Sequence, residues 1–408
     1  MNSELARRIA FTLGALLLFR IGTYIPVPGI DPAIWAQIMR AQGGGILSAF
    51  NAISGGAVGR LSILALGILP YVSAAVIIQL VAYFSARLRR LQSSGESGRR
   101  RLETYTRIFT FAMALLQSAG IASALADIDN LVDAPGPLFL VSVTLTLTGG
   151  TMFLIWLSGQ ITLRGLGNGV ALILCVGVIV ELPAAIAGAL ELSRRGLVSG
   201  DLLVGLAALT VVLMGFVTLM EKARRRERVE FGTGPARGSY LSLKLNGAGT
   251  IPALVASWVM ALPLIPAGFA DPSDPTVWTE VAQTLSPGRP LYFVCYGIAV
   301  FVLVYLYTSF VLDPDELAER LKRHGGVIPQ VEPGEATAVY LDAVLSRTTL
   351  IGASYFAALC LTLAFLQAWL KVPFFLAGTS LLILVCTILD LESQAGNLAK
   401  TSLGGLRE

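Results

Sequence analysis

Few residues of this chain could do covalent or acid–base chemistry. The one histidine, His324, lies in a basic segment between apolar runs, where solvation accounts for it. The sequence has no HExxH pair, no C-x-x-C pair and no Walker phosphate loop, and the glycines of residues 165–169 lack dinucleotide spacing. Its four cysteines lie inside apolar runs, at spacings that fit neither a metal site nor a disulfide framework. We therefore expect no enzyme, no metal and no cofactor.

Polar groups inside the apolar runs are mostly uncharged. Gln79, Gln117, Asn246 and Ser257 suit hydrogen bonds between helices. Arg20 lies near one end of the first run, where its side chain can snorkel to the interface. Buried ionisable groups are the usual mark of a coupled pump. Their scarcity argues against a proton-driven antiporter and an intramembrane hydrolase, and leaves a passive conduit or a transporter of neutral ligands.

These polar groups lie in apolar runs that predict membrane spans. The chain has 408 residues, of which 55% are hydrophobic and 14% charged, with a mean hydropathy of +0.72. Runs such as 63–84 and 137–157 are long enough to cross a bilayer as helices. We predict an all-α polytopic membrane protein of ten spans. Their centres lie near Leu17, Ser73, Ala114, Leu147, Val178, Ala208, Val255, Phe301, Ala358 and Leu382.

Arginine and lysine set the orientation of these spans. They gather in loops 85–107, 222–247 and 312–348, which all fall on one side together with both termini. By the positive-inside rule this side is cytoplasmic. The net charge of +4 is therefore a topology signal, and no specific nucleic-acid partner is expected.

One outer segment does not fit a simple loop. Residues 41–62 are glycine-rich and half apolar, too interrupted to span and too apolar for a solvated loop. A short re-entrant helix is the natural interpretation, because irregular backbone at membrane depth must be buried or line a cavity. Ten spans also divide into two groups of five, and a group of five inverts its topology. Such inverted repeats are common in secondary transporters.

Several long motifs carry a resemblance to a known family. They include FRIGTYIPVPGI (19–30), GESGRRR (95–101), QITLRGLGNGV (160–170), LKLNGAGTIPALVAS (243–257) and AGTSLLILV (377–385). In these motifs and their order the chain resembles the SecY family, the pore-forming subunits of the bacterial Sec translocase, related to Sec61-alpha. The resemblance implies two inverted five-helix halves, residues 1–190 and 191–391, around a central pore, and a cytoplasmic tail, 392–408. It implies no catalytic activity.

The resemblance also implies a channel site. A re-entrant plug lies at about 48–62, and a lateral gate is formed mainly by helices two, three, seven and eight. The implied pore ring is Val72, Val76, Val170, Leu174, Leu254 and Ile383. The plug residues are Phe50, Asn51, Ser54, Gly55 and Gly56. The gate residues are Gln79, Gln117, Ser257 and Trp258. Within the ring, the spacing of four between Val72 and Val76 puts both on one helix face.

The implied function is passage of unfolded secretory polypeptides across the bacterial cytoplasmic membrane and lateral release of membrane segments into lipid. Implied partners are SecE-like and SecG-like small subunits, a SecA-like motor ATPase or the ribosome, signal peptides, nascent chains and the bilayer. The motor or ribosome would dock on the cytoplasmic loops after helices six and eight. The docking residues are Arg224, Arg225, Arg226, Arg228, Lys322, Arg323 and Glu332.

Three features depart from the family pattern. Glu332 stands where the family usually has arginine, loop 222–247 is short, and Trp258 replaces a small residue near the gate. They indicate either a divergent housekeeping copy or an accessory one. A secondary transporter of small solutes built on inverted repeats is the alternative function. A sealed structural scaffold is a third, weaker one.

Overall fold

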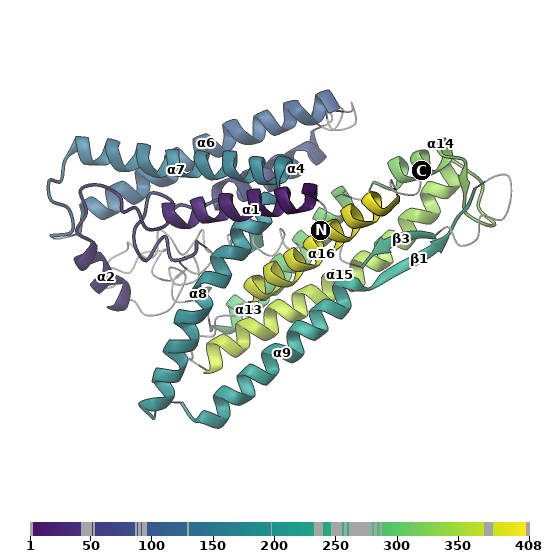
Figure 1. Cartoon of the computed structure of the whole chain (residues 1–408). Helices are drawn as coiled ribbons and strands as arrows, with labels where there is room; N and C mark the ends of the chain where they lie inside the picture. Colours follow the sequence, from purple (N-terminus) through teal and green to yellow (C-terminus); the bar gives the residue numbers. More distant parts are fainter. Residues whose placement is uncertain are drawn as a thin grey trace. The chain divides into compact units, whose positions relative to one another are not determined.

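The protein's structure, a computed structural model, is almost entirely helical (Figure 1). It describes residues 3–41, 51, 54–85, 88, 91, 96–128, 130–196, 198–231, 240–245, 255–256, 259–260, 280, 284–285, 288–311, 313–370 and 378–404. Within these residues, 6 helices are long and apolar enough to cross a membrane. The predicted all-α membrane fold is confirmed.

All predicted span centres except Val255 lie in long described helices. The helices are α1 (Ser3–Gly22), α4 (Leu69–Phe84), α6 (Glu96–Ala126), α7 (Pro137–Arg164), α8 (Gly169–Arg194), α9 (Gly200–Lys222), α13 (Pro290–Val311), α15 (Glu335–Leu370) and α16 (Gly378–Gly404). Most of the span around Val255 lies outside the described residues.

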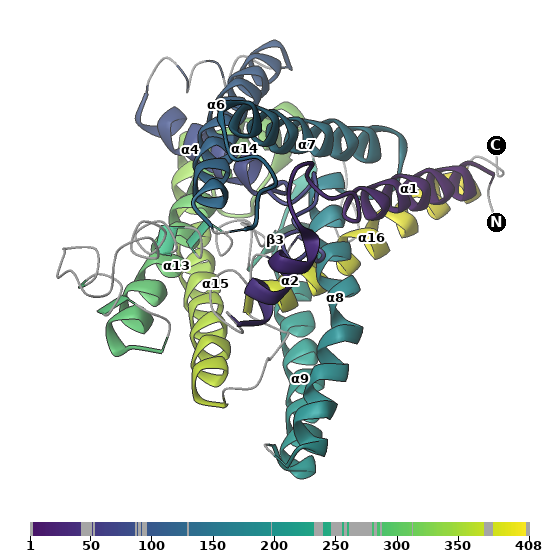
Figure 2. The same ribbon diagram turned by 90° about the vertical axis from the view of Figure 1, so that its left-hand side faces the viewer.

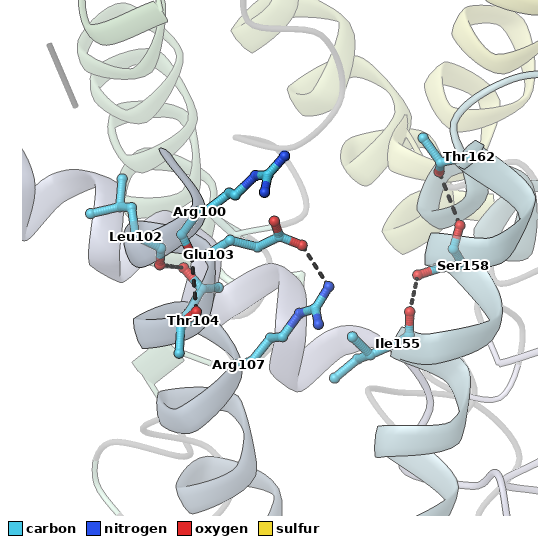
Figure 3. Close-up of polar contacts among 9 residues, drawn as sticks. Arg100, Leu102, Glu103, Thr104, Arg107, Ile155, Ser158 and Thr162 are labelled. Carbon is cyan, nitrogen blue, oxygen red and sulfur yellow. Dashed lines mark hydrogen bonds and ion pairs between the residues drawn. The ribbon is translucent and has the colours of Figure 1, made fainter. Parts of the chain in front are cut away.

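Two predicted loop boundaries are wrong. Helix α6 already begins at Glu96, so most of the basic motif 95–101 is helical, and α15 begins at Glu335, inside the predicted loop 312–348. Figure 3 shows the start of α6, where Glu103 pairs with Arg107 at 2.6 Å. Hydropathy locates the apolar part of a span, whereas a helix continues past the hydrocarbon wherever charged residues can pair one turn apart. Helix α16 likewise continues to Gly404, so the predicted tail begins as helix.

The chain forms two compact units, Met1–Gly205 with Lys371–Glu408, and Leu206–Leu370. In the first unit, α6 packs along α7 and α4, and α8 packs against α7 and α16. Helix α1 contacts α7, α8 and α16, and Figure 2 shows it alongside α16. The backbone at Ile63 can approach α7 closely because Gly150 of α7 has no side chain. A Cβ at this position would meet the Ile63 carbonyl.

One end of the first unit has its own hydrophobic core. Helix α2 (Pro32–Ala41) places Trp35 against Val27, Leu61 and Phe139. The Trp35 indole donates to the Val58 carbonyl at 2.9 Å. Backbone bonds join Val27 N to Leu61 O at 2.9 Å and Ile63 N to Ile25 O at 2.9 Å. These contacts fix the last residues of the predicted plug against the segments around Val27 and Trp35 that follow α1.

In the second unit, α13 packs along α15, and α14 (Pro314–Arg323) packs against the start of α15. Strand β1 (Arg224–Arg228) pairs antiparallel with β3 (Tyr240–Lys244). Strand β2 (Glu230–Phe231) pairs with β4 (Gly326–Val327). Leu243 packs with Val344 and Leu345 of α15 beneath this small sheet. The loops after α9 and α13 therefore form one folded surface.

Candidate pore, plug and docking surfaces

The predicted pore ring begins at the first turn of α8. Asn168 caps this helix, because its side-chain oxygen accepts from Val170 N at 3.0 Å and Ala171 N at 3.3 Å. Val170 is half-buried and Leu174, one turn later, is buried. Val72 and Val76 of α4 and Ile383 of α16 are also buried. Leu254 lies outside the described residues.

The structure brings the α8 and α16 parts of this ring together. The Thr387 hydroxyl of α16 donates to the Ala171 carbonyl at 3.5 Å. Farther along α16, the Gln394 side chain accepts from Gly167 N at 2.9 Å, immediately before α8. The α4 residues lie on a helix that packs against α6 and α7. The ring as a whole stays a prediction.

The described plug residues, 54–62, form successive turns. Asn51 organises them, since its carbonyl accepts from the Ser54 hydroxyl at 3.0 Å and its side-chain oxygen accepts from Gly59 N at 2.5 Å. Ser54, Gly55 and Gly56 are buried, and both glycines have positive φ, +68° and +79°. Side chains rarely adopt this backbone, so the turns need glycine here. Phe50 and residues 48, 49, 52 and 53 lie outside the described residues.

The plug turns rest on α8. A Cβ built on Gly55 would lie 3.2 Å from the Gly177 Cα, so two glycines let the plug and helix meet backbone to backbone. One turn along α8, Glu181 fills the space beside Gly56, where a Cβ would meet both the Glu181 carboxylate and the Arg60 guanidinium. Glu181 is not among the sequence-predicted site residues. A single acidic residue in the middle of the span around Val178 was the signal that could have found it.

Two arginines hold the same turns. Arg20 Nη1 donates to the Gly55 carbonyl at 2.8 Å, and Arg60 Nη2 donates to the same oxygen at 2.9 Å. Arg20 Nη2 also donates to the Tyr24 hydroxyl at 2.6 Å, and Arg60 Nε to the Thr23 carbonyl at 3.2 Å. Arg20 therefore does more than snorkel, because it binds the plug backbone directly.

The predicted lateral gate is partly described. Gln79 lies on α4 and Gln117 on α6, and these two helices pack against each other. The side-chain oxygens of both are buried and accept no hydrogen bond within the described part of the chain. A buried acceptor without a partner costs about 1–3 kcal/mol. Ser257 and Trp258, the other two gate residues, lie outside the described residues.

The predicted docking arginines divide between the two faces of the β1–β3 pair. Directly paired residues share a face. Arg224, Arg226 and Arg228 pair with Lys244, Ser242 and Tyr240 and lie exposed on the outward face. Arg225 lies on the opposite face, where its Nε donates to Glu227 at 2.6 Å. This hydrogen bond raises the pKa of the Arg225 guanidinium.

Glu227 ties this hairpin to α15, since it also accepts from the Tyr340 hydroxyl at 3.1 Å. Lys322 and Arg323 are exposed in the last turn of α14, and Arg323 pairs with Glu319 at 2.6 Å. Glu332 is exposed in the turn that leads into α15. The structure thus gathers all seven predicted docking residues on the small folded surface of the second unit, with Arg225 set apart as an anchor.

The described residues contain no group of three His, Cys, Asp or Glu side chains that could hold a metal ion. Among the cysteines, Cys175 and Cys360 are buried. His324 is exposed at the end of α14.

Comparison with known proteins relates the whole chain to one family. The SecY family model matches residues 62–391. The chain is 41% identical to the protein translocase subunit SecY of Escherichia coli strain K12, over 98% of this chain and 93% of that protein. It is also 41% identical to the same subunit of Vibrio cholerae, over 96% of this chain and 91% of that protein.

Two solved structures have the same fold. One, described as the structure of a protein conducting channel, has a TM-score of 0.74 at 19% identity and covers 97% of this chain and 93% of its own. The other, Sec61 in the canine ribosome–channel complex from the endoplasmic reticulum, has a TM-score of 0.69 at 18% identity, with the same coverage.

Proposed function

Because the chain belongs to the SecY family, we propose that it conducts unfolded polypeptides through a pore closed by Val72, Val76, Val170, Leu174, Leu254 and Ile383. The chain is a channel subunit of a protein translocase, a membrane protein whose job is passage rather than catalysis. The observation that carries this function is 41% identity over 93% of the length of a translocase subunit. The alternative of a small-solute transporter falls, since that identity spans nearly the whole chain.

The ring's chemistry suits a seal that yields. Its aliphatic side chains offer no ligand to ions or water, and a hydrophobic constriction closes by dewetting. A passing chain of any sequence can displace them, since none binds a particular residue type. Val76 and Ile383 are 3% and 1% exposed, whereas Val81 and Ile388 on the same two helices are 45% and 50% exposed. Each helix therefore presents one buried and one exposed face.

Opening follows from differential binding. An apolar signal segment enters the lateral gate, between the second and third spans (α4 and α6) and the seventh and eighth spans (centred near Val255 and Phe301). The plug then moves away from α8. Each buried CH₂ of the signal contributes about 0.8 kcal/mol. The ligand shifts the equilibrium only by its preference for the open state. The buried side-chain oxygens of Gln79 and Gln117 accept no hydrogen bond from the described residues, and they lie on two helices that pack together, α4 and α6. The polar backbone of an entering segment would supply a donor.

Site-specific cross-linking of a stalled secretory chain tests the ring. Probes at Val76, Leu174 and Ile383 should couple to the chain, whereas matched probes at Val81 and Ile388 should couple to lipid. Coupling at the two exposed positions alone would remove the ring assignment.

The proposed driving partner is a SecA-like motor or the ribosome, docked on Arg224, Arg226, Arg228, Lys322 and Arg323. All five side chains are exposed, three on the outward face of β1 and two in the last turn of α14. SecE-like and SecG-like subunits complete the assembly in the bacterial cytoplasmic membrane, with both termini of this chain in the cytoplasm. We also propose that residues 1–190 and 191–391 form the two inverted halves of the channel.

Purification in mild detergent tests the assembly. A small single-span subunit should co-purify at equal amounts, and a motor ATPase or ribosome should bind the washed complex. The proposed assembly would be contradicted if neither partner stayed bound to the chain in membranes that still translocate.

A further inference from the structure

One backbone oxygen of the plug receives two cations. Arg20 comes from α1 and Arg60 from the last turns of the predicted plug, and both donate to the Gly55 carbonyl. Both guanidinium carbons also lie over the Tyr24 ring, at 4.5 and 4.3 Å from its centroid. Hydrogen bonds from charged donors are about twice as strong as neutral ones. The plug is therefore held by charge as well as by packing.

Two guanidinium groups this close repel each other unless an anion lies nearby. Glu181 of α8 supplies it, because the charged side chains that act on its carboxylate are Arg60 and Arg20. The carboxylate and the Arg60 guanidinium together fill the space over Gly56. No larger residue than glycine fits at position 56 while both stay in place.

The position of Glu181 on α8 connects this cluster to the pore ring. Val170, Leu174, Gly177 and Glu181 follow one another at spacings of four, three and four residues, so they share one helix face. That face carries two predicted ring residues, then the seat of Gly55, then the carboxylate. A movement of α8 that widens the ring must also shift Gly177 and Glu181 against the plug.

Backbone strain marks the end of the same segment. Leu61 has φ +43°, a left-handed conformation that costs a non-glycine residue about 1–2 kcal/mol. The Leu61 carbonyl accepts from Val27 N at 2.9 Å. Leu61 directly follows Arg60, whose guanidinium is part of the cluster. Such strain persists only where surrounding contacts impose it, and it is released when they break.

We propose that Arg20, Arg60 and Glu181 form a plug clasp, with Glu181 as the positioning residue that sets how apolar a signal segment must be to open the channel. The inference rests on the proposed function. A weak signal binds the open state too little to break the clasp, whereas a strong signal overcomes it. The clasp is thus a specificity device for the substrate class of apolar signal segments.

The test compares Glu181→Gln with Glu191→Gln in the full chain, purified with its co-purifying subunits and reconstituted into bilayers. Glu191 is a matched control, because it lies on the same helix and pairs with Arg195 on an exposed surface. We expect Glu181→Gln to raise the resting ion conductance about tenfold, whereas Glu191→Gln leaves it unchanged. Export of a reporter with a shortened apolar signal should rise in parallel.

A labelling readout separates plug movement from general loosening. In a variant with Cys295 and Cys386 replaced by alanine, Ser54→Cys is buried in the closed plug, since Ser54 is 8% exposed. Glu181→Gln should speed its reaction with a water-soluble maleimide, whereas the rate at buried Cys360 stays low. If Glu181→Gln fails to accumulate, Glu181→Asp, which keeps the charge on a shorter stem, should give a smaller rise of the same kind.

Two further variants make the proposal falsifiable. Glu181→Gln should add nothing in an Arg60→Ala background, because interacting residues are non-additive. Deletion of residues 48–62 must open a conductance if the chain is a channel at all. Deletion that conducts, with Glu181→Gln identical to wild type, overturns the clasp alone. Deletion without conductance, together with failure to translocate, overturns the channel function itself.

Discussion

Two groups of arginines in this molecule have opposite environments. Arg20 and Arg60 donate to a plug carbonyl, and Arg60 lies beside Glu181, which is on the face of α8 that leads to the predicted ring. Arg224, Arg226 and Arg228 project from the outward face of a two-stranded hairpin and are exposed. In the sequence, Arg224, Arg226 and Arg228 belong to the predicted cytoplasmic loop 222–247, whereas Arg20 and Arg60 lie outside all three basic loops.

The difference is one of solvation. An exposed guanidinium keeps its water, so an ion pair there is worth about 0–1 kcal/mol. Partly buried donors that lose their partner leave a charge without compensation, which costs several times more. Under the two proposals above, the plug arginines control a conformational equilibrium, whereas the hairpin arginines control encounter with a partner. Substitutions in the two groups should separate resting closure from driven transport.

The largest effect is expected at the plug seat. Gly55→Val places a branched side chain at φ +68° and toward the Gly177 Cα. The left-handed backbone alone costs about 1–2 kcal/mol. Since about 1.4 kcal/mol is tenfold, the resting conductance should rise by about five- to thirtyfold. Planar-bilayer recording measures it.

Gly188→Val is the control for added side-chain volume on α8. Gly188 lies on α8, and a Cβ built there meets nothing within 4 Å. Equal conductance in the two variants would show that the contact with α8 does not close the channel.

A second substitution addresses the outward face of the hairpin. Arg226→Glu should lower motor- or ribosome-driven translocation by about two- to tenfold at low salt, because interfacial charges mainly steer association. Resting conductance should stay at the wild-type level. The measurement is protease protection of a translocated substrate at several salt concentrations.

Arg225→Gln is its matched control on the opposite face of β1. It breaks the contact with Glu227, so it should lower the thermal unfolding midpoint while transport stays near the wild-type rate. Equal transport defects in Arg225→Gln and Arg226→Glu would mean that the two faces are not functionally distinct.

A smaller effect is expected at Glu332, which is exposed on the same surface. Glu332→Arg restores the charge usual in the family and should raise transport with a standard SecA-like motor by about two- to threefold. Initial rates in a reconstituted assay check it. An unchanged rate would place Glu332 outside the motor contact, and Glu335→Arg, at the first residue of α15, controls for added charge.

Much of the fold was predictable from local patterns. Apolar runs located every described long helix, since a span of about 20 residues needs continuous apolar sequence. The ends were harder. Glu96 and Glu335 begin helices outside the apolar runs, where pairs such as Glu103 with Arg107 support the extra turns. Hydropathy has no term for such pairs, so helix starts were placed too late.

The candidate site divides in the same way. The ring, plug and gate residues followed from motifs, because a motif carries the position of a residue along with its type. The plug clasp did not, since Arg20 and the Gly55 carbonyl are 35 residues apart and meet only through the turns between them. Glu181 was missed because one carboxylate hardly changes the mean hydropathy of a 26-residue helix.

The smallest effect is expected at the exposed pair of Glu319 and Arg323 on α14. The hydrogen bond from Arg323 lowers the pKa of the Glu319 carboxyl below its ordinary value of 4.5. A lowered pKa contributes stability above the ordinary value, and that contribution is lost as the pH falls through the lowered one. Glu319→Gln should therefore change the thermal midpoint only at neutral pH, by about 1 °C or less for an exposed pair. Thermal unfolding at pH 7 and at acid pH measures it. A large shift at neutral pH would mean that exposed pairs in the second unit contribute as much as the clasp does, and the distinction between the two arginine groups would fail.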